Sequence, residues 1–293
     1  MMKKTVGERI FDIFNAVFMF LMIVVTLYPI LYVLFASLSD SNRLMAHKGI
    51  LLKPLGVQFE AYKQVFMNQM VVSSFGNTLY YVFFGSFLSI LVTTLGAFAL
   101  SRKRLWIKKY INILVVVTMF FSGGLIPTFL LVKELGLYGA RMAIILPTLV
   151  NTYNLIVLRT AFYAFPDSLE EAAKIDGAND FRILFQLVIP LTKATMAVVL
   201  LFYAVARWND WFQASIYLRE RSKYPLQLYL REILINSSTD SMTNGAATGQ
   251  DVLAMSESIK YATVMVSTLP ILAIYPFLQK YFVKGVMIGA VKE

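Results

Sequence analysis

The sequence predicts an all-α integral membrane protein with six transmembrane helices, forming a single domain over residues 1–293. Only 15% of the 293 residues are charged and 58% are hydrophobic, whereas a soluble domain carries roughly 25% charged residues. The apolar residues gather in runs long enough to cross a bilayer, which takes about 20 residues of helix. Six runs qualify, at residues 11–38, 77–100, 110–132, 142–162, 194–218 and 261–282.

Prolines interrupt four of the six runs, and membrane helices tolerate them where neighbouring groups satisfy the freed carbonyls. The third run also contains Gly123 and Gly124. This pair either unwinds the helix as a hinge or lets neighbouring helices approach closely, and the sequence leaves both interpretations open. The prolines are Pro29 in the first run, Pro127 in the third, Pro147 in the fourth, and Pro270 and Pro276 in the last.

Basic residues set the expected orientation, because short cytoplasmic connections are enriched in Lys and Arg. They precede the first run, fill the connection at 101–109 and follow the last run. Both termini and the connection at 163–193 are therefore predicted to be cytoplasmic, with 39–76 and 219–260 outside. The first apolar run is too long for a cleaved signal peptide, so we expect it to be retained.

The remaining composition argues against several classes of site. The net charge is +10, but the basic residues lie between apolar runs rather than on one soluble face, which argues against nucleic-acid binding. The sequence has no Cys, and its one histidine, His47, lies in a polar segment. Disulfides, thiolate chemistry and metal sites built on His or Cys are therefore not expected, and no catalytic residue is assigned.

The connection after the fourth run has the pattern of two short helices joined by a glycine turn. Glu170 and Lys174 are four residues apart, so they can pair on one helix face. Gly177 is expected to end the first helix in a left-handed conformation. Asn179 or Asp180 can then cap the second helix. The pattern predicts a stiff segment held at both ends by membrane spans.

This connection resembles the EAA loop of permease subunits in binding-protein-dependent ABC importers. The matching residues are Glu171-Ala172-Ala173, then Gly177, then Leu187-x-Ile189-Pro190. The family more often has isoleucine at the position of Leu187 and leucine at the position of Ile189. The resemblance implies the type I ABC importer permease fold, with this segment as a cytoplasmic coupling helix against a separate ATPase. The alternative is an amphipathic helix that merely lies at the membrane surface. The implied ATPase-coupling residues are Glu170, Glu171, Ala172, Ala173, Asp176, Gly177, Arg182 and Pro190.

Two further stretches resemble the maltose-permease type and its oligosaccharide-transporting branch. They are residues 120–127 with Leu135-Gly136-Leu137, and the tail at 281–292. The likeness covers nearly the whole chain after Met70. It implies that the tail reaches the ATPase dimer as a second contact, in an extended conformation that its small residues suit. The alternative is a frayed chain end. The implied contact residues are Gly285, Gly289 and Lys292.

Polar residues within the apolar runs are the candidates for a wall of the substrate pathway. Ionisable residues in a span usually face a polar interior, Trp rings suit the C–H surfaces of sugars, and amide groups suit hydroxyls. The alternatives are an Arg207–Asp210 pair, an interfacial aromatic belt, packing against a partner subunit, and hydrogen bonds between helices. The candidates are Trp208, Asn209, Asp210, Trp211, Asn151 and Asn154.

The same resemblance implies the partners. They are a homologous second permease subunit in a heterodimer, an ATPase dimer holding ATP and Mg²⁺, an extracellular solute-binding protein, a sugar or oligosaccharide, and the lipid of a bacterial cell membrane. The sequence has no Gly-x-x-x-x-Gly-Lys-Ser/Thr phosphate loop, so ATP hydrolysis is assigned to the ATPase and this chain is predicted to be neither an enzyme nor a cofactor carrier. The alternatives are a permease for a non-sugar solute, a secondary transporter, which usually has inverted repeats and ion-coupling charges, and a membrane-embedded enzyme.

Overall fold

The structure is a computed structural model that describes residues 5–102, 107–243 and 250–290, with side chains placed at 5–102, 107–235, 255–274 and 276. Within these residues every regular element is helical, and extended backbone pairs only in an isolated bridge between Ser39 and Val57. The predicted all-α class is therefore confirmed. The chain divides into two compact units, residues 1–69 with 232–269 and residues 70–231 with 270–293, and each is described by itself.

The first unit begins with a long apolar helix, α1 (Val6–Ser37), followed by α2 (Ser41–Ala46) and α3 (Glu60–Met67). A capping box starts α1. The Thr5 hydroxyl accepts from the Glu8 N–H at 3.3 Å, and the Glu8 carboxylate accepts from the Thr5 N–H at 2.7 Å. These two bonds satisfy donors that the first turn of a helix otherwise leaves open, so the helix begins sharply just after the basic N-terminal residues.

A small buried cluster lies at the end of α1. Ala36 is fully buried and groups with Leu44 and Leu51. Tyr32 packs edge-on against Tyr261 of α16 (Gln250–Ala290), with ring centroids 6.0 Å apart. Most of the large apolar side chains earlier in α1 are exposed within this unit, as expected for a helix that faces lipid or another chain.

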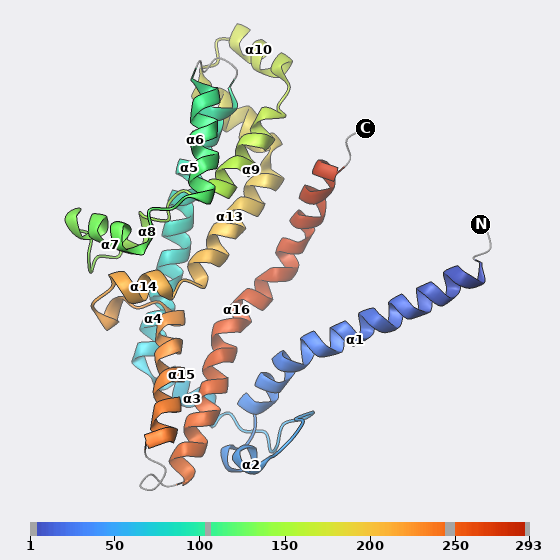
Figure 1. The fold of residues 1–293 in the computed structure, drawn as a ribbon, viewed down its shortest axis with the longest axis vertical. Coiled ribbons are helices and arrows are strands. Elements are labelled where there is room, and N and C mark those ends of the chain that lie inside the picture. The colour runs from blue at the N-terminus through green and yellow to red at the C-terminus, as the bar shows by residue number, and fades with distance from the viewer. Residues whose placement is uncertain (1–4, 103–106, 244–249, 291–293) are drawn as a thin grey trace. The chain divides into compact units, whose positions relative to one another are not determined.

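The second unit contains the elements that carry the candidate site, and Figure 1 labels most of them along the chain. In chain order they are α4 (Gln69–Tyr80), the π-helix η1 (Tyr81–Gly85), α5 (Ser86–Ser101), α6 (Lys108–Phe120), α7 (Leu125–Glu134), α8 (Met142–Ile145), α9 (Thr152–Tyr163), α10 (Asp167–Ile175), α11 (Asp180–Ile183), the π-helix η2 (Leu184–Val188), α12 (Ile189–Leu191), α13 (Lys193–Trp208), α14 (Phe212–Tyr217), the 3₁₀-helix η3 (Arg221–Lys223) and α15 (Leu226–Thr243). Helix α15 continues into the first unit, and α16 runs from the first unit into the second.

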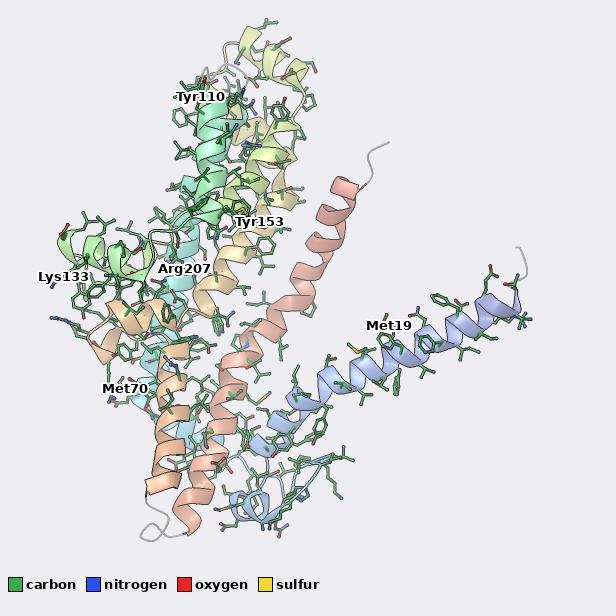
Figure 2. All side chains as sticks on the ribbon, viewed as in Figure 1. Met19, Met70, Tyr110, Lys133, Tyr153 and Arg207 are labelled. Atoms are coloured by element: carbon green, nitrogen blue, oxygen red, sulfur yellow. The ribbon has the colours of Figure 1, made fainter. Side chains whose placement is uncertain are left out.

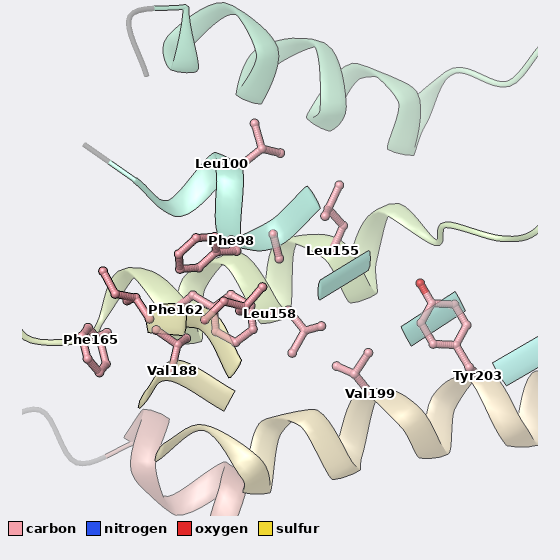
Figure 3. Packing of buried hydrophobic residues seen from close by; sticks show 12 residues of the cluster. Phe98, Leu100, Leu155, Leu158, Phe162, Phe165, Val188, Val199 and Tyr203 are labelled. Carbon is pink, nitrogen blue, oxygen red and sulfur yellow. The ribbon is translucent and has the colours of Figure 1, made fainter. Parts of the chain in front are cut away.

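One apolar core joins α5, α9 and α13, which pack against one another (Figures 1 and 3). Phe162 and Leu158 of α9 and Val199 of α13 are fully buried in it. Ile183 and Val188 belong to the same core and are also fully buried, although they come from the connection between α9 and α13. The second half of that connection is therefore fixed to the spans by side-chain packing as well as by the chain.

Within the part of the chain that the structure describes, three uninterrupted helices are long and apolar enough to cross a membrane: Val6–Ser37, Gln69–Ser101 and Met255–Ile274. Two bent pairs of helices are long and apolar enough only when each pair is counted together. Lys108–Phe120 and Leu125–Glu134 meet at 112°, and Asp180–Leu191 meets Lys193–Trp208 at 88°. These helices confirm a membrane protein, whereas the count of six spans stays a prediction.

The third predicted run is broken into two helices. Phe120 ends α6, Leu125 begins α7, and Gly124 between them has φ +86°, a left-handed conformation that favours glycine. A Cβ at Gly124 would meet no atom within 4 Å, and one at Gly123 would meet only a carbon of Pro127 at 4.0 Å. Within this chain, the glycine pair therefore unwinds the helix and does not serve close packing.

The apolar run at 142–162 is not one continuous helix. Helix α8 ends at Ile145, and α9 starts only at Thr152. Pro147 offers no N–H, and its ring would clash with the carbonyl four residues earlier in a continuous helix. Asn151 then begins α9 by accepting from the Asn154 N–H at 3.1 Å. The fifth run is likewise divided, because α13 ends at Trp208 and the chain is helical again only from Phe212.

Candidate functional site

The connection at 166–191 folds as the sequence predicted, as a helix, a glycine turn and a second helix. Gly177 has φ +78° and closes α10 with two backbone hydrogen bonds. Its own N–H donates to the Lys174 carbonyl at 3.0 Å, and the Ala178 N–H donates to the Ala173 carbonyl at 2.9 Å. This pair of bonds is a Schellman motif, which requires a left-handed residue at the position of Gly177. The left-handed backbone conformation at position 177 therefore explains why a glycine is present there.

Asn179 makes the cap that starts the second helix, since its side-chain oxygen accepts from the Arg182 N–H at 2.8 Å. The Arg182 guanidinium then donates to Gln186 at 2.9 Å, along the same helix. The turn just before Pro190 is the π-helix η2. A wider turn relieves the clash that a proline ring makes with the carbonyl four residues earlier. These local devices give the segment a defined shape.

Glu170 is the centre of an ion cluster that the sequence predicted only in part. Its carboxylate pairs with Lys174, as the four-residue spacing indicated, and also with Arg102 at the end of α5. The side chains of Arg102 and Glu170 are only 15% and 16% exposed. Burial raises the pKa of Glu170, but the Lys174 hydrogen bond and the Arg102 charge lower it more, so the pKa lies below its usual value.

The opposite face of α10 and the turn after it are open to solvent. Glu171, Ala172, Asp176 and Gly177 are exposed, whereas Ala173 packs against the core. The structure therefore separates two neighbouring acids that the sequence had grouped together. Glu170 faces the spans and Glu171 faces away from them.

Exposed apolar side chains on this connection were missed by the sequence analysis. Ile175 is 86% exposed, and Leu169, Phe181 and Phe185 are also exposed. Phe181 and Phe185 are four residues apart, so they share a helix face. The signal was present in the sequence as apolar residues in a polar segment, but only the helix boundaries show that they are not core residues.

A cleft of about 650 Å³, lined by both aromatic and polar side chains, lies between α9 and the end of α13. It brings together five of the six residues predicted for the pathway, and two residues of its lining, Tyr153 and Arg207, are labelled in Figure 2. Aromatic and amide side chains dominate its lining, the combination that suits a sugar. The five predicted residues that line it are Asn151, Asn154, Asn209, Asp210 and Trp211, and the sequence had not assigned Phe202 or Tyr203 to it.

Arg207 forms one wall of this cleft and is itself buried. Its guanidinium donates to the carbonyls of Ile144 at 2.6 Å and Ile145 at 3.0 Å, and also to Thr148. These oxygens belong to the end of α8 and the turn after it, where helix carbonyls lack partners. Arg207 therefore holds the broken fourth run in place. Asp210, predicted as an alternative partner for Arg207, accepts from the Gln213 N–H at 3.1 Å at the start of α14.

Trp208 lies away from the cleft. It is buried, and its ring packs edge-on against Phe75 of α4 with centroids 6.0 Å apart. It lines a separate, apolar groove on α13. Trp211, which does line the cleft, carries the Arg231 guanidinium over its ring at 3.8 Å. Of Trp208 and Trp211, only Trp211 is placed to contact a solute in the cleft.

The tail residues were predicted to be extended, but α16 continues as a helix through Ala290. Gly285 and Gly289 are therefore four residues apart on one helix, where residues at this spacing share a face. Their side-chain surroundings and Lys292 lie outside the described residues. Among the residues described, no three His, Asp or Glu side chains are arranged to hold a metal ion.

Residues 92–288 match the model of the family described as binding-protein-dependent transport system inner membrane component, so the chain belongs to this family of membrane transport proteins. The polygalacturonan/rhamnogalacturonan transport system permease protein YtcP of Bacillus subtilis (strain 168) is 39% identical over 285 residues, or 97% of this chain and 99% of the relative. Protein LplC of the same strain is 38% identical over 291 residues, or 99% and 98% of the two chains.

A solved structure supports the same assignment. A chain from a bacterial ABC transporter involved in the import of the acidic polysaccharide alginate superposes with a TM-score of 0.87 and is 32% identical, covering 96% of this chain and 100% of that chain. The predicted resemblance to ABC importer permeases and the predicted permease fold are confirmed by these matches.

Proposed function

We propose that this chain is the membrane-spanning subunit of an ATP-driven importer for oligosaccharides, and that it forms half of the pathway beside a homologous second permease subunit. The observation that carries the proposal is the connection at 166–191. It combines a defined shape, anchorage in the core of the spans, and an exposed face that is both acidic and apolar. A segment with these three properties can bind a separate protein and transmit its movement.

In this proposal α10 and the turn after it dock on an ATPase subunit, which supplies ATP and Mg²⁺. The exposed Glu171 and Ile175 lie on the docking face, while Asn179, Arg182 and Pro190 keep the second helix in shape. The 88° bend between Asp180–Leu191 and α13 turns a push along the docking helix into a tilt of the span. Both chain termini and this loop are cytoplasmic, and the C-terminal helix end near Gly285 and Gly289 makes a second contact with the ATPase dimer.

The solute is proposed to be an oligosaccharide that passes through the cleft between α9 and the end of α13 after delivery by an extracellular solute-binding protein. The relatives above carry names that refer to polygalacturonan or rhamnogalacturonan, and to alginate. The galactooligosaccharides transport system permease protein GanQ of Bacillus subtilis (strain 168), 28% identical over 290 residues covering 96% of this chain and 95% of the relative, also belongs to this group. A cleft lined by Trp211, Phe212 and Tyr153, with amides beside them, offers stacking faces and hydrogen-bond partners for sugar rings.

The test is reconstitution of the complete transporter in proteoliposomes with Glu171→Lys in this chain. We expect lost co-purification of the ATPase and lost uptake of oligosaccharide, with normal membrane insertion. Glu134→Lys, a matched reversal of an exposed acid on α7, is expected to keep the ATPase bound. Normal association and uptake with Glu171→Lys would overturn the docking assignment. Uptake that survives ATP depletion but not collapse of an ion gradient would point instead to a secondary transporter.

A further inference from the structure

Arg102 joins three helices through one side chain. Its guanidinium pairs with Glu170 of α10, donates to the Phe162 carbonyl in the last turn of α9 at 3.1 Å, and donates to the Ser101 hydroxyl of α5 at 3.0 Å. The same group lies over the ring of Phe98, 4.5 Å from its centroid. All three nitrogens of the guanidinium are thus engaged, each toward a different helix.

This arrangement uses the geometry that distinguishes arginine from lysine. A guanidinium is a planar fork that donates in several fixed directions and stacks on aromatic rings, whereas an ammonium is a compact charge on a flexible stem. Glu170 is held on its other side by Lys174, so the carboxylate is fixed between two cations. We refer to Arg102, Glu170 and Lys174 as the ion clamp.

The ion clamp connects parts of the chain that the backbone does not connect directly. Helix α10 is covalently continuous with α9 before it and α11 after it, but α5 lies 68 residues earlier at the contact between Arg102 and Glu170. Without the clamp, a movement of α10 would reach α5 only through side-chain packing in the shared core. With it, the docking helix is tied to the cytoplasmic end of α5 by charged hydrogen bonds in a largely buried place.

We propose that the ion clamp is a positioning element that passes movement of the docking helix to α5, and so sets how much solute is carried for each ATP hydrolysed. The proposal rests on the proposed function, since it assumes that α10 docks on an ATPase. It assigns different tasks to the two adjacent acids. Glu171, on the exposed face, binds the ATPase, and Glu170, on the hidden face, transmits the movement.

The experiment measures both tasks in the complete transporter. Arg102→Ala and Glu170→Ala are made singly and together, and the purified complexes are reconstituted with a uronate trisaccharide and with maltotriose as solutes. We expect the ATPase to stay bound and ATP to be hydrolysed, while the solute imported per ATP falls several-fold. Because the two residues act as a pair, the double variant is expected to be no worse than the more severe single one.

A second readout reports the clamp without transport. The chain has no Cys, so a thiol placed by Ser101→Cys, at a position 3% exposed, can be labelled without background in this chain. In Arg102→Ala, the loss of the charged hydrogen bonds that hold the end of α5 is expected to raise the labelling rate of this thiol about tenfold or more. Arg159→Ala is the control, because it removes an arginine of α9 that is not part of the clamp. It should leave both the labelling rate and the solute imported per ATP unchanged. Arg102→Lys, which keeps the charge but not the fork, should lie between native and Arg102→Ala.

The outcomes separate this inference from the proposed function. An unchanged yield per ATP in Arg102→Ala with an exposed thiol would show that the clamp only supports the fold, and would overturn the inference. Loss of the ATPase from Arg102→Ala would also overturn it, because the clamp would then serve docking. If instead Glu171→Lys keeps the ATPase bound, the docking assignment itself fails, whatever Arg102→Ala does.

Discussion

Replacement of Gly177 tests whether the end of the docking helix is fixed by backbone conformation alone. The residue has φ +78°, and a Cβ built there would meet no atom within 4 Å. Any loss therefore comes from the left-handed conformation, which costs an L-residue roughly 1–2 kcal/mol. If docking needs the native helix end, this strain appears as a loss of about 5- to 30-fold in affinity for the ATPase.

The order of the substitutions is more diagnostic than their size. Asn tolerates the left-handed region, Ala does so less well, and a β-branched residue worst. We therefore expect Gly177→Asn to bind the ATPase almost as well as native, Gly177→Ala to bind more weakly, and Gly177→Val to bind weakest. The measurement is the dissociation constant between the solubilised permease pair and a fluorescently labelled ATPase. Gly76→Ala, in open space on α4, is the control. Equal affinity across the series, or Asn as damaging as Val, would refute the reasoning.

Three further predictions concern the docking face, the ion clamp and the cleft. Ile175→Ala is expected to weaken ATPase binding by about tenfold, since burying such a side chain stabilises by roughly 1.5–3 kcal/mol, whereas Ile126→Ala, at a residue 72% exposed on α7, should leave the dissociation constant unchanged. The pKa of Glu170 is lowered in the folded chain, so its stabilising effect is fully present above the usual value of 4.5 and is lost as pH falls through the lower folded value. The difference in thermal stability between native and Glu170→Gln should therefore stay constant as pH falls from neutrality towards 4.5, and should shrink at lower pH. A difference that grows in acid would contradict the lowered pKa of Glu170. Arg231→Ala, which removes the cation over Trp211, is expected to reduce uptake of a uronate trisaccharide more than uptake of maltotriose, and an equal loss for both sugars would show that Arg231 only orients the ring.

Local spacing was enough to predict the parts of the site that are local in the chain. The Glu170–Lys174 pair, the Asn179 cap and the left-handed Gly177 each depend on residues within one helical turn, and all three are present. Arg102 could not be found in this way. Its role comes from a contact 68 residues away along the chain, and in the sequence it is one of several basic residues that indicate only orientation.

Hydropathy predicted where apolar residues occur but not where helices break. Residues 142–162 are apolar enough for a span, and yet Pro147 and the Asn151 cap divide them. The same limit explains Trp208 and Trp211. In a continuous helix these residues would share a face, but α13 ends at Trp208, so the next three residues do not follow helical geometry. Consequently Trp211 lines the cleft and Trp208 packs on Phe75.

The break at 121–124 has a consequence for the lipid around the protein. An α-helix end leaves as many as four backbone groups without partners, and this break creates one C-terminal and one N-terminal end within a single apolar run. Hydrocarbon provides no hydrogen-bond partner for such groups. Water, lipid headgroups or another polypeptide must therefore supply the hydrogen-bond partners beside Gly124.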